Sequence, residues 1–159
     1  MDLPESIGDV LDKYGVYGTT TKGTSMQPLF RTRRDMIILQ RPTSELKKYD
    51  VVLYNAPYGK NIMHRIIKVL PDKYLIRGDN TFVNEYIPKE DIIAVMVAFN
   101  RKGRRYDVTG AGYRAYCVVW TVIYPVRKLF FKIRCAVLRI GSFVKRRILG
   151  IRNGDSNEK

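Results

Sequence analysis

The sequence has few of the residues that stabilise disulfide-rich and metal-dependent folds. It contains two cysteines, Cys117 and Cys135, and a single histidine, His64. Two cysteines are too few for a disulfide scaffold, and their spacing fits no zinc site. One histidine excludes a histidine-rich metal centre. We therefore expect neither a metal ion nor a cofactor.

The N-terminal segment also lacks the features of a secretory signal peptide. Residues 1–15 carry four acidic residues and have neither a basic start nor an apolar centre. Apolar residues at steps of three and four predict instead a short amphipathic helix that ends at Gly15, with Pro4 near its start. These apolar residues are Ile7, Val10, Leu11 and Tyr14. We expect this helix to dock on the body of the protein.

No apolar run is long enough to cross a bilayer. The mostly apolar stretch over residues 113–126 has 14 residues, against the roughly 20 that a transmembrane helix needs. The chain as a whole has 159 residues and a mass of 18.5 kDa, which suits one domain with an appendage.

Positive charge is the property that the sequence has in excess, and it is concentrated in the last third. Residues 1–100 carry 14 Lys and Arg against 12 Asp and Glu, a net charge of +2, whereas residues 101–159 carry 15 against 3, a net charge of +12. This asymmetry predicts a nearly neutral globular body and a basic arm that meets phosphates, on nucleic acid or on a membrane.

Strand signals dominate from Val16 to about Asn100. Short runs rich in β-branched and aromatic residues alternate with breaks that contain Pro, Gly, Asp or Asn. The runs are 36–39, 51–54, 62–67, 74–76 and 92–99, and the breaks include 41–42, 56–59, 70–72 and 78–80. We expect a mainly β fold, with a compact, mostly antiparallel body over residues 1–100 that includes the N-terminal helix.

The C-terminal region has a different pattern. We expect a basic connector over residues 101–112, a helical membrane-associating appendage over 113–150 and a flexible tail over 151–159. Residues 129–149 alternate apolar and basic positions at helical steps, which indicates a basic amphipathic helix. Packing of its apolar stripe on the β body is the alternative. The residues expected to contact an anionic membrane are Trp120, Tyr124, Arg127, Lys128 and Lys132.

Ser25 and His64 are the candidate catalytic residues of the sequence. Ser25 lies between Gly23 and Pro28 in a constrained turn, and such a turn can expose a hydroxyl and gather backbone N–H groups around one point. An imidazole can accept a serine proton at neutral pH, so the two residues form the minimal pair for nucleophilic catalysis. By spacing alone, a core histidine and an ordinary loop serine are the more common explanation.

Four segments together resemble the type I signal peptidase family of serine endopeptidases, in order and in approximate spacing. They cover about half of the chain, from Gly23 to Phe99: Ser25-Met26-x-Pro28, Asp50-Val51-Val52, His64-Arg65-Ile66 and Gly78-Asp79-Asn80. Bacterial leader peptidases and the LexA-type self-cleaving repressors have Lys at the position of His64. The sequence resembles the branch with His, which includes the endoplasmic-reticulum and archaeal enzymes.

This resemblance implies roles for particular residues. Ser25 matches the nucleophile and His64 the general base. The acidic residue that orients the histidine is either Glu85, at a position where the family has Asp, or Asp79 of the Gly-Asp-Asn segment. The bacterial pattern often has Ser where this chain has Gly23. The oxyanion donors are therefore expected to be the backbone N–H of Ser25 together with that of Met26, with Thr24 as the alternative to Met26.

The resemblance further implies a coiled antiparallel β-sheet of the signal peptidase and LexA type. The substrate is a precursor protein or peptide bound as an added strand, with small side chains at P1 and P3. We expect a membrane-associated enzyme without a clear transmembrane span, at a prokaryotic cytoplasmic membrane, with no nucleic-acid partner; the sequence does not indicate an oligomeric state. A LexA-like regulator that associates with DNA and a non-catalytic module that keeps the fold are the alternatives.

Overall fold

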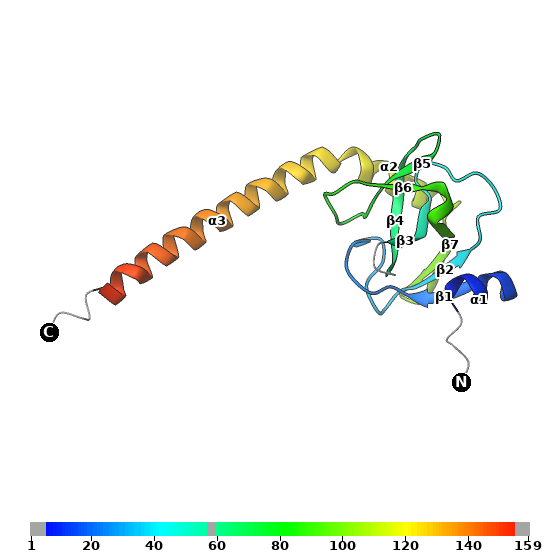
Figure 1. The fold of residues 1–159 in the computed structure, drawn as a ribbon, viewed down its shortest axis with the longest axis horizontal. Helices are drawn as coiled ribbons and strands as arrows, with labels where there is room; N and C mark the ends of the chain where they lie inside the picture. The colour runs from blue at the N-terminus through cyan, green and yellow to red at the C-terminus, as the bar shows by residue number, and fades with distance from the viewer. Residues whose placement is uncertain (1–5, 57–59, 155–159) are drawn as a thin grey trace. The chain divides into compact units, whose positions relative to one another are not determined.

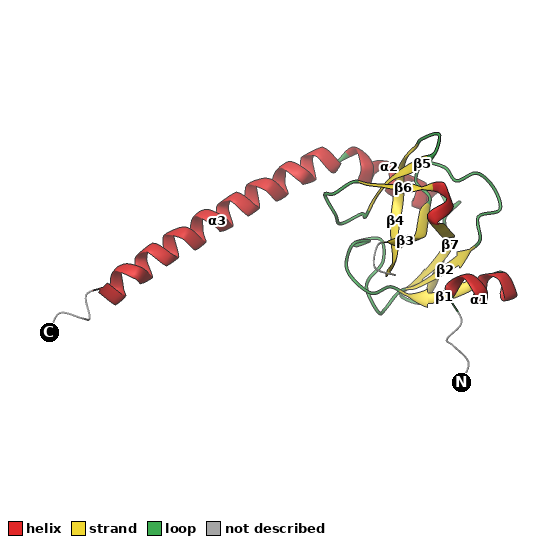
Figure 2. Cartoon of the chain, viewed as in Figure 1, coloured by secondary structure: helices red, strands yellow, loops and turns green. Residues whose placement is uncertain are grey.

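The structure is a computed structural model that describes residues 6–56 and 60–154, with the backbone alone for residues 140–154. Figure 1 shows the order of the elements along the chain, and Figure 2 separates helices, strands and loops. The elements are α1 (Ile7–Tyr14), β1 (Tyr17–Thr20), β2 (Met36–Gln40), β3 (Val51–Ala56), β4 (Lys60–Val69), β5 (Lys73–Arg77), β6 (Glu85–Pro88), the 3₁₀ helix η2 (Lys89–Asp91), β7 (Ile92–Arg101), β8 (Arg104–Asp107), α2 (Ala111–Val122) and α3 (Tyr124–Gly154).

The body is an antiparallel sheet, and the predicted mainly β fold is confirmed. Its eight strands follow the order β1-β2-β7-β3-β4-β5-β6, with β8 paired to β7, and every pairing is antiparallel. Each of the five predicted runs lies within a strand. Strands β1, β6 and β8 are too short or too polar for the run pattern to predict them. The predicted break at 56–59 falls partly on residues 57–59, outside the described residues.

Both faces of the central strands are buried, so the sheet has a hydrophobic cluster on each side. In β3, Val51 and Leu53 pack in one cluster with Leu11 and Phe30, and Val52 and Tyr54 pack in the other with residues such as Ile76. Successive side chains of a strand point to opposite faces. His64 pairs with Val52 and Arg65 pairs with Val51. His64 and Arg65 therefore lie on opposite faces of β4.

Helix α1 begins and ends as its sequence predicts. Ser6 caps its N-terminus in a capping box with Asp9, and Gly15 is its C-cap. Leu11 is buried in the first cluster, with Ile7 packed against it, and α1 lies beside β1 (Figure 1). The helix thus docks on the body. Pro4 lies outside the described residues.

The predicted boundaries of the C-terminal region are wrong in three places. The predicted connector over 101–112 contains β8, which pairs with the end of β7 in a hairpin, and its last two residues belong to α2. The chain divides into two compact units between Thr121 and Val122, not at residue 113, because residues 113–121 make polar and apolar contacts with the β body. Helix α3 continues to Gly154, four residues into the predicted flexible tail; residues 155–159 lie outside the described residues.

The apolar side chains of helix α3 are largely exposed as far as the side chains are described. Six of them are each more than half exposed: Val126, Leu129, Phe130, Ile133, Val137 and Leu138. Neither α3 nor any other helix in the described part of the chain has both the length and the apolar character needed to cross a membrane. The apolar stripe and the basic residues between its members agree with the predicted amphipathic pattern.

Candidate active site

Ser25 lies in the loop between β1 and β2, drawn in green in Figure 2. The next residue, Met26, is buried in the first hydrophobic cluster and anchors the loop. Gly23 has a φ angle of 91°, a backbone conformation that favours glycine. Its carbonyl oxygen accepts a hydrogen bond from the hydroxyl of Thr32. The backbone conformation thus favours glycine at this position.

His64 lies in β4 and contacts two polar groups through Nδ1. The Nδ1 atom is 3.0 Å from Oε1 of Glu85 and 3.3 Å from the hydroxyl oxygen of Tyr54. That hydroxyl donates to Oε2 of Glu85 over 2.8 Å, so its proton is not available to His64. Nδ1 must therefore be the donor in both of its contacts, which leaves Nε2 unprotonated in the neutral ring.

The environment of His64 favours the neutral imidazole. Burial lowers the pKa of His64 below its ordinary value of 6.5, and the negative charge and hydrogen bond of Glu85 oppose part of this effect. At neutral pH the ring is therefore an available base. Burial also raises the pKa of the Tyr54 hydroxyl, as does its hydrogen bond to Glu85, so Tyr54 keeps its proton and stays a donor.

Gly78 lies where Ser25 and His64 meet. A Cβ atom on Gly78 would lie 2.8 Å from the carbonyl oxygen of Ser25 and 2.9 Å from Nε2 of His64. Both distances are shorter than real Cβ contacts, so only glycine fits between these two groups. Among the described residues, neither the Ser25 hydroxyl nor His64 Nε2 forms a hydrogen bond. Catalytic hydrogen bonds are often long or poorly aligned before the substrate binds.

Ser25 and His64 line one cavity of about 650 Å³. Its wall is largely apolar and comes from the first cluster, from α1 and from β1; it includes Ile7, Tyr17, Phe30, Leu39, Leu53 and Met63. The nucleophile candidate and the base candidate therefore face a common space, and that space accepts apolar groups.

Asn80 fixes the two peptide groups on either side of the Ser25 α-carbon. Its backbone N–H donates to the Ser25 carbonyl over 2.7 Å, and its side-chain amide donates to the Thr24 carbonyl over 3.3 Å. In a trans peptide the C=O and the following N–H point in opposite directions. The two bonds therefore fix the directions of the Ser25 and Met26 N–H groups, neither of which has a hydrogen-bond acceptor within residues 6–56 and 60–154.

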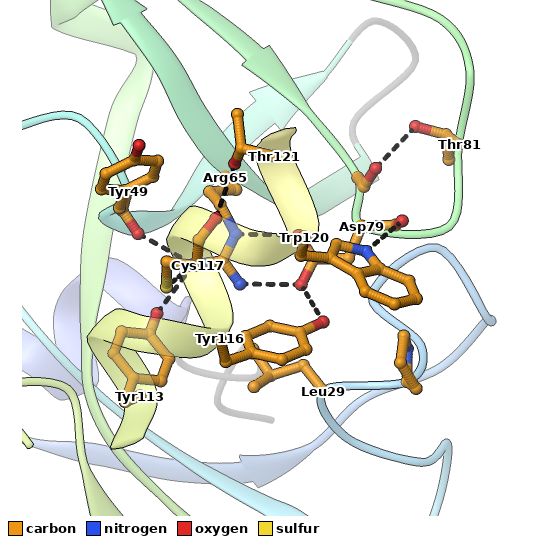
Figure 3. Close-up of polar contacts among 12 residues, drawn as sticks. Leu29, Tyr49, Arg65, Asp79, Thr81, Tyr113, Tyr116, Cys117, Trp120 and Thr121 are labelled. Atoms are coloured by element: carbon orange, nitrogen blue, oxygen red, sulfur yellow. Dashed lines mark hydrogen bonds and ion pairs between the residues drawn. The ribbon is translucent and has the colours of Figure 1, made fainter. Parts of the chain in front are cut away.

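The two acidic candidates have different partners. Glu85, the first residue of β6, contacts His64. The carboxylate of Asp79 instead accepts two hydrogen bonds from Arg65, at 2.8 and 2.7 Å, on the opposite face of β4. It also accepts a hydrogen bond from Tyr116 of α2 (Figure 3). The structure thus brings Glu85 to the imidazole and binds Asp79 to a guanidinium.

Trp120, one of the residues expected to contact a membrane, forms contacts with the β body. Its indole N–H donates to the backbone carbonyl of Asp79 over 2.8 Å (Figure 3), and its ring stacks on Tyr116. Trp120 thus packs on the β body, because a buried carbonyl there needs a donor. The other expected membrane residues lie in α3: Tyr124, Arg127, Lys128 and Lys132.

Four contributions to the site are not evident from the sequence: those of Tyr54, Arg65 and Tyr116, and the role of Gly78 as a spacer. Tyr54 lay within a predicted strand run, but its place beside His64 follows only from the β3–β4 register, which pairs Val52 with His64. Two strand positions beyond Val52, Tyr54 faces the same side. The alternating pattern would have found it had the register been known.

No group of three or more His, Cys, Asp and Glu side chains in the described part of the chain is placed to hold a metal ion. No family model matches the chain, and no curated protein matches it. The resemblance to signal peptidases therefore rests on the motifs of the sequence alone.

Proposed function

We propose that the protein is a serine endopeptidase that removes a signal or leader segment from a precursor at a membrane surface. The observation that carries the proposal is the arrangement around His64. Glu85 contacts Nδ1, Nε2 is unprotonated in the neutral ring, and His64 lines one cavity together with Ser25. An acid, a base and a hydroxyl in this order are the components of serine catalysis.

In the proposed mechanism, His64 Nε2 takes the hydroxyl proton of Ser25 as Oγ attacks the scissile carbonyl carbon. The resulting imidazolium donates Nδ1–H to Glu85, whose negative charge stabilises it. Nε2 then protonates the leaving amine, and an acyl ester remains on Ser25. A water molecule, deprotonated by His64, hydrolyses that ester and restores the serine.

Backbone N–H groups stabilise the oxyanion in this mechanism. Asn80 holds the Thr24 and Ser25 carbonyls, so the N–H groups of Ser25 and Met26 keep fixed directions throughout the reaction. Preorganised donors of this kind need no rearrangement when charge develops on the substrate oxygen. Gly23 offers no side-chain hydroxyl, so the donation falls to the backbone.

The substrate in this proposal is an extended segment with apolar residues. Tyr17 and Thr19 of β1 line the cavity with Ser25, and β1 ends the strand order of the described sheet. An extended peptide can pair with such an end strand and place alternate side chains in the apolar wall. The motif resemblance supports the same class of substrate.

The test uses the full chain with a pool of synthetic precursors, each an apolar segment followed by small residues at P1 and P3, read by mass spectrometry. We expect cleavage by the wild type and by the control Ser44→Ala, because Ser44 is an exposed loop residue. We expect no cleavage by Ser25→Ala. A fluorophosphonate should add its mass to Ser25 and not to the Ser25→Ala chain. Equal cleavage by Ser25→Ala, or neither cleavage nor adduct in the wild type, would refute the proposal.

Helix α3 supports the membrane part of the proposal. Eight Lys and Arg lie between Arg127 and Arg147, and Phe130, Ile133 and Val137 form an exposed apolar stripe. A basic residue near an anionic surface contributes about 1 kcal/mol, and the apolar stripe adds contacts with the acyl chains. DNA would attract the basic residues of α3 but would offer no apolar surface for its stripe.

Sedimentation with vesicles tests this part separately. We expect the full chain to sediment with phosphatidylglycerol vesicles and to stay in solution with phosphatidylcholine vesicles. Phe130→Ser should weaken sedimentation severalfold, whereas Ala136→Ser, on the same helix, serves as the control. Retention on DNA that survives Phe130→Ser, without binding to vesicles, would overturn the membrane proposal and favour a DNA-associated regulator.

A further inference from the structure

Helix α2 reaches into the loop that follows β5. Two of its side chains bind Asp79: the Tyr116 hydroxyl donates to Oδ2 over 2.9 Å, and the Trp120 indole donates to the backbone carbonyl over 2.8 Å (Figure 3). The two residues are four apart on the helix, and their rings stack with centroids 5.7 Å apart. Asp79 is thereby bound at its side chain and at its backbone by one helix.

The residue after Asp79 holds the nucleophile loop. Asn80 donates one hydrogen bond to the Ser25 carbonyl and one to the Thr24 carbonyl. Gly78, on the other side of Asp79, fits between Ser25 and His64. A continuous series of short contacts therefore runs from α2 through Asp79 and Asn80 to the two N–H groups beside Ser25.

The same helix makes a second set of contacts, which reach Asp79 only through Arg65. Arg65, which is 1% exposed, donates through Nη1 to the hydroxyl of Tyr113 and to Sγ of Cys117, at 3.0 and 2.9 Å. These contacts satisfy a buried guanidinium, and both Tyr113 and Cys117 act on Asp79 indirectly, through Arg65. Tyr113 and Tyr116 thus offer a matched pair of tyrosines, one bonded to Arg65 and the other to Asp79.

We propose that Tyr116 and Trp120 are positioning residues of the catalytic site. They hold Asp79, so that Asn80 keeps the Ser25 and Met26 N–H groups in the directions that oxyanion stabilisation requires. This role rests on the proposed peptidase function. It makes α2 a part of the catalytic body, although the sequence assigned residues 113–122 to a membrane appendage.

The experiment compares Tyr116→Phe and Trp120→Phe with the control Tyr113→Phe in the full chain. Each substitution keeps an aromatic ring at its position and removes one hydrogen-bonding group. The first readout is amide hydrogen exchange at Asn80, which is independent of catalysis. Loss of one hydrogen bond to Asp79 should speed this exchange about five- to tenfold, whereas Tyr113→Phe should change it less than twofold, at matched global stability.

The second readout is whether the loss of activity toward a cleaved precursor appears in kcat or in KM. Misdirected oxyanion donors weaken binding of the transition state alone, so kcat should fall about five- to tenfold in both test variants while KM stays unchanged. The Tyr113→Phe enzyme should keep the kcat of the wild type. A purely structural role would lower the free energy of unfolding in all three variants and leave kcat equal.

The outcomes separate the two proposals. If the wild type cleaves nothing, the peptidase proposal fails and the positioning role fails with it, even if exchange at Asn80 shows that α2 holds the loop. If the wild type is active, unchanged exchange at Asn80 in both test variants overturns the positioning role alone. Faster exchange with an unchanged kcat overturns it as well.

Discussion

Two consecutive residues of β4 show how one strand can serve two purposes. His64 and Arg65 are both buried and both lie against an acidic side chain, Glu85 and Asp79 respectively. On the His64 face the acid is a third exposed, and His64 lines the cavity. On the Arg65 face both side chains are almost completely buried, and helix α2 covers them.

The difference lies in whether the charge can change. Burial lowers the pKa of His64, so its ring loses its charge readily. Burial also acts to lower the pKa of Arg65, but the hydrogen bonds and the charge of Asp79 outweigh it and raise that pKa. A permanent buried ion pair fixes structure, whereas a titratable pair beside a cavity can move protons. We expect substitutions on the two faces to have different consequences.

The largest expected effect is on activity, from the His64 face. His64→Ala should lower kcat/KM by about 10⁴-fold or more, since it removes the base. The free energy of unfolding should change by less than about 2 kcal/mol, because the ring is neutral and one edge faces the cavity. Kinetics and urea unfolding of the same preparation measure both quantities. Full activity in this variant would remove the contrast between the faces.

The next largest effect is on stability, from the Arg65 face. Asp79→Asn should lower the free energy of unfolding by about 3–5 kcal/mol, because it leaves the buried Arg65 guanidinium without its counter-charge. Glu85→Gln should cost less than about 1 kcal/mol, since Glu85 is partly exposed. Urea unfolding compares the two variants directly. Equal losses would contradict the assignment of one pair to structure and the other to chemistry.

Glu85→Gln also tests the electrostatics of the His64 face. Without the carboxylate, the pKa of His64 should fall further below 6.5, because Glu85 raises it in the wild type. The acid limb of the pH–rate profile should shift to lower pH, and kcat should fall about 10²-fold as the ring loses its orienting partner. His64 is the only histidine, so the NMR titration of a chain without a histidine tag gives its pKa directly. A rise in that pKa would refute the assignment.

The lowered pKa of His64 also sets the sign of its contribution to stability. Below pH 6.5 the unfolded chain takes up a proton at this residue before the folded protein does, so the contribution of His64 to the free energy of unfolding falls as pH drops. Glu85→Gln should enlarge this decrease. Urea unfolding at several pH values measures it.

The smallest effect is expected from Tyr54→Phe. The hydroxyl of Tyr54 donates to Glu85 and contacts Nδ1 of His64, so its loss loosens the orienting carboxylate without removing it. We expect kcat to fall about tenfold with little change in KM. Tyr74→Phe, a second buried tyrosine of the same hydrophobic cluster, is the control. An equal fall in kcat in the two variants would show that Tyr54 contributes through packing alone.

The sequence by itself was enough for much of the fold. Runs of β-branched residues predicted five strands, and Ile7 and Leu11 with Gly15 predicted α1, because periodicity and capping are local properties. The sequence did not predict β6, because Glu85 begins a strand of only four residues. It also did not predict where the body ends. Tyr116 and Trp120 pack on the β body, although aromatic residues of this kind suit a membrane surface equally well.

For the site, the sequence named Ser25, His64 and the two acidic candidates, because their motifs are short and ordered along the chain. Only the tertiary structure decided between the partners. Strand alternation places His64 and Arg65 on opposite faces of β4, and the pairing of β5 with β6 brings Glu85 to the first face while the loop after β5 brings Asp79 to the second. Which acid meets which base depends on strand register, and register is set by pairing between segments distant in sequence.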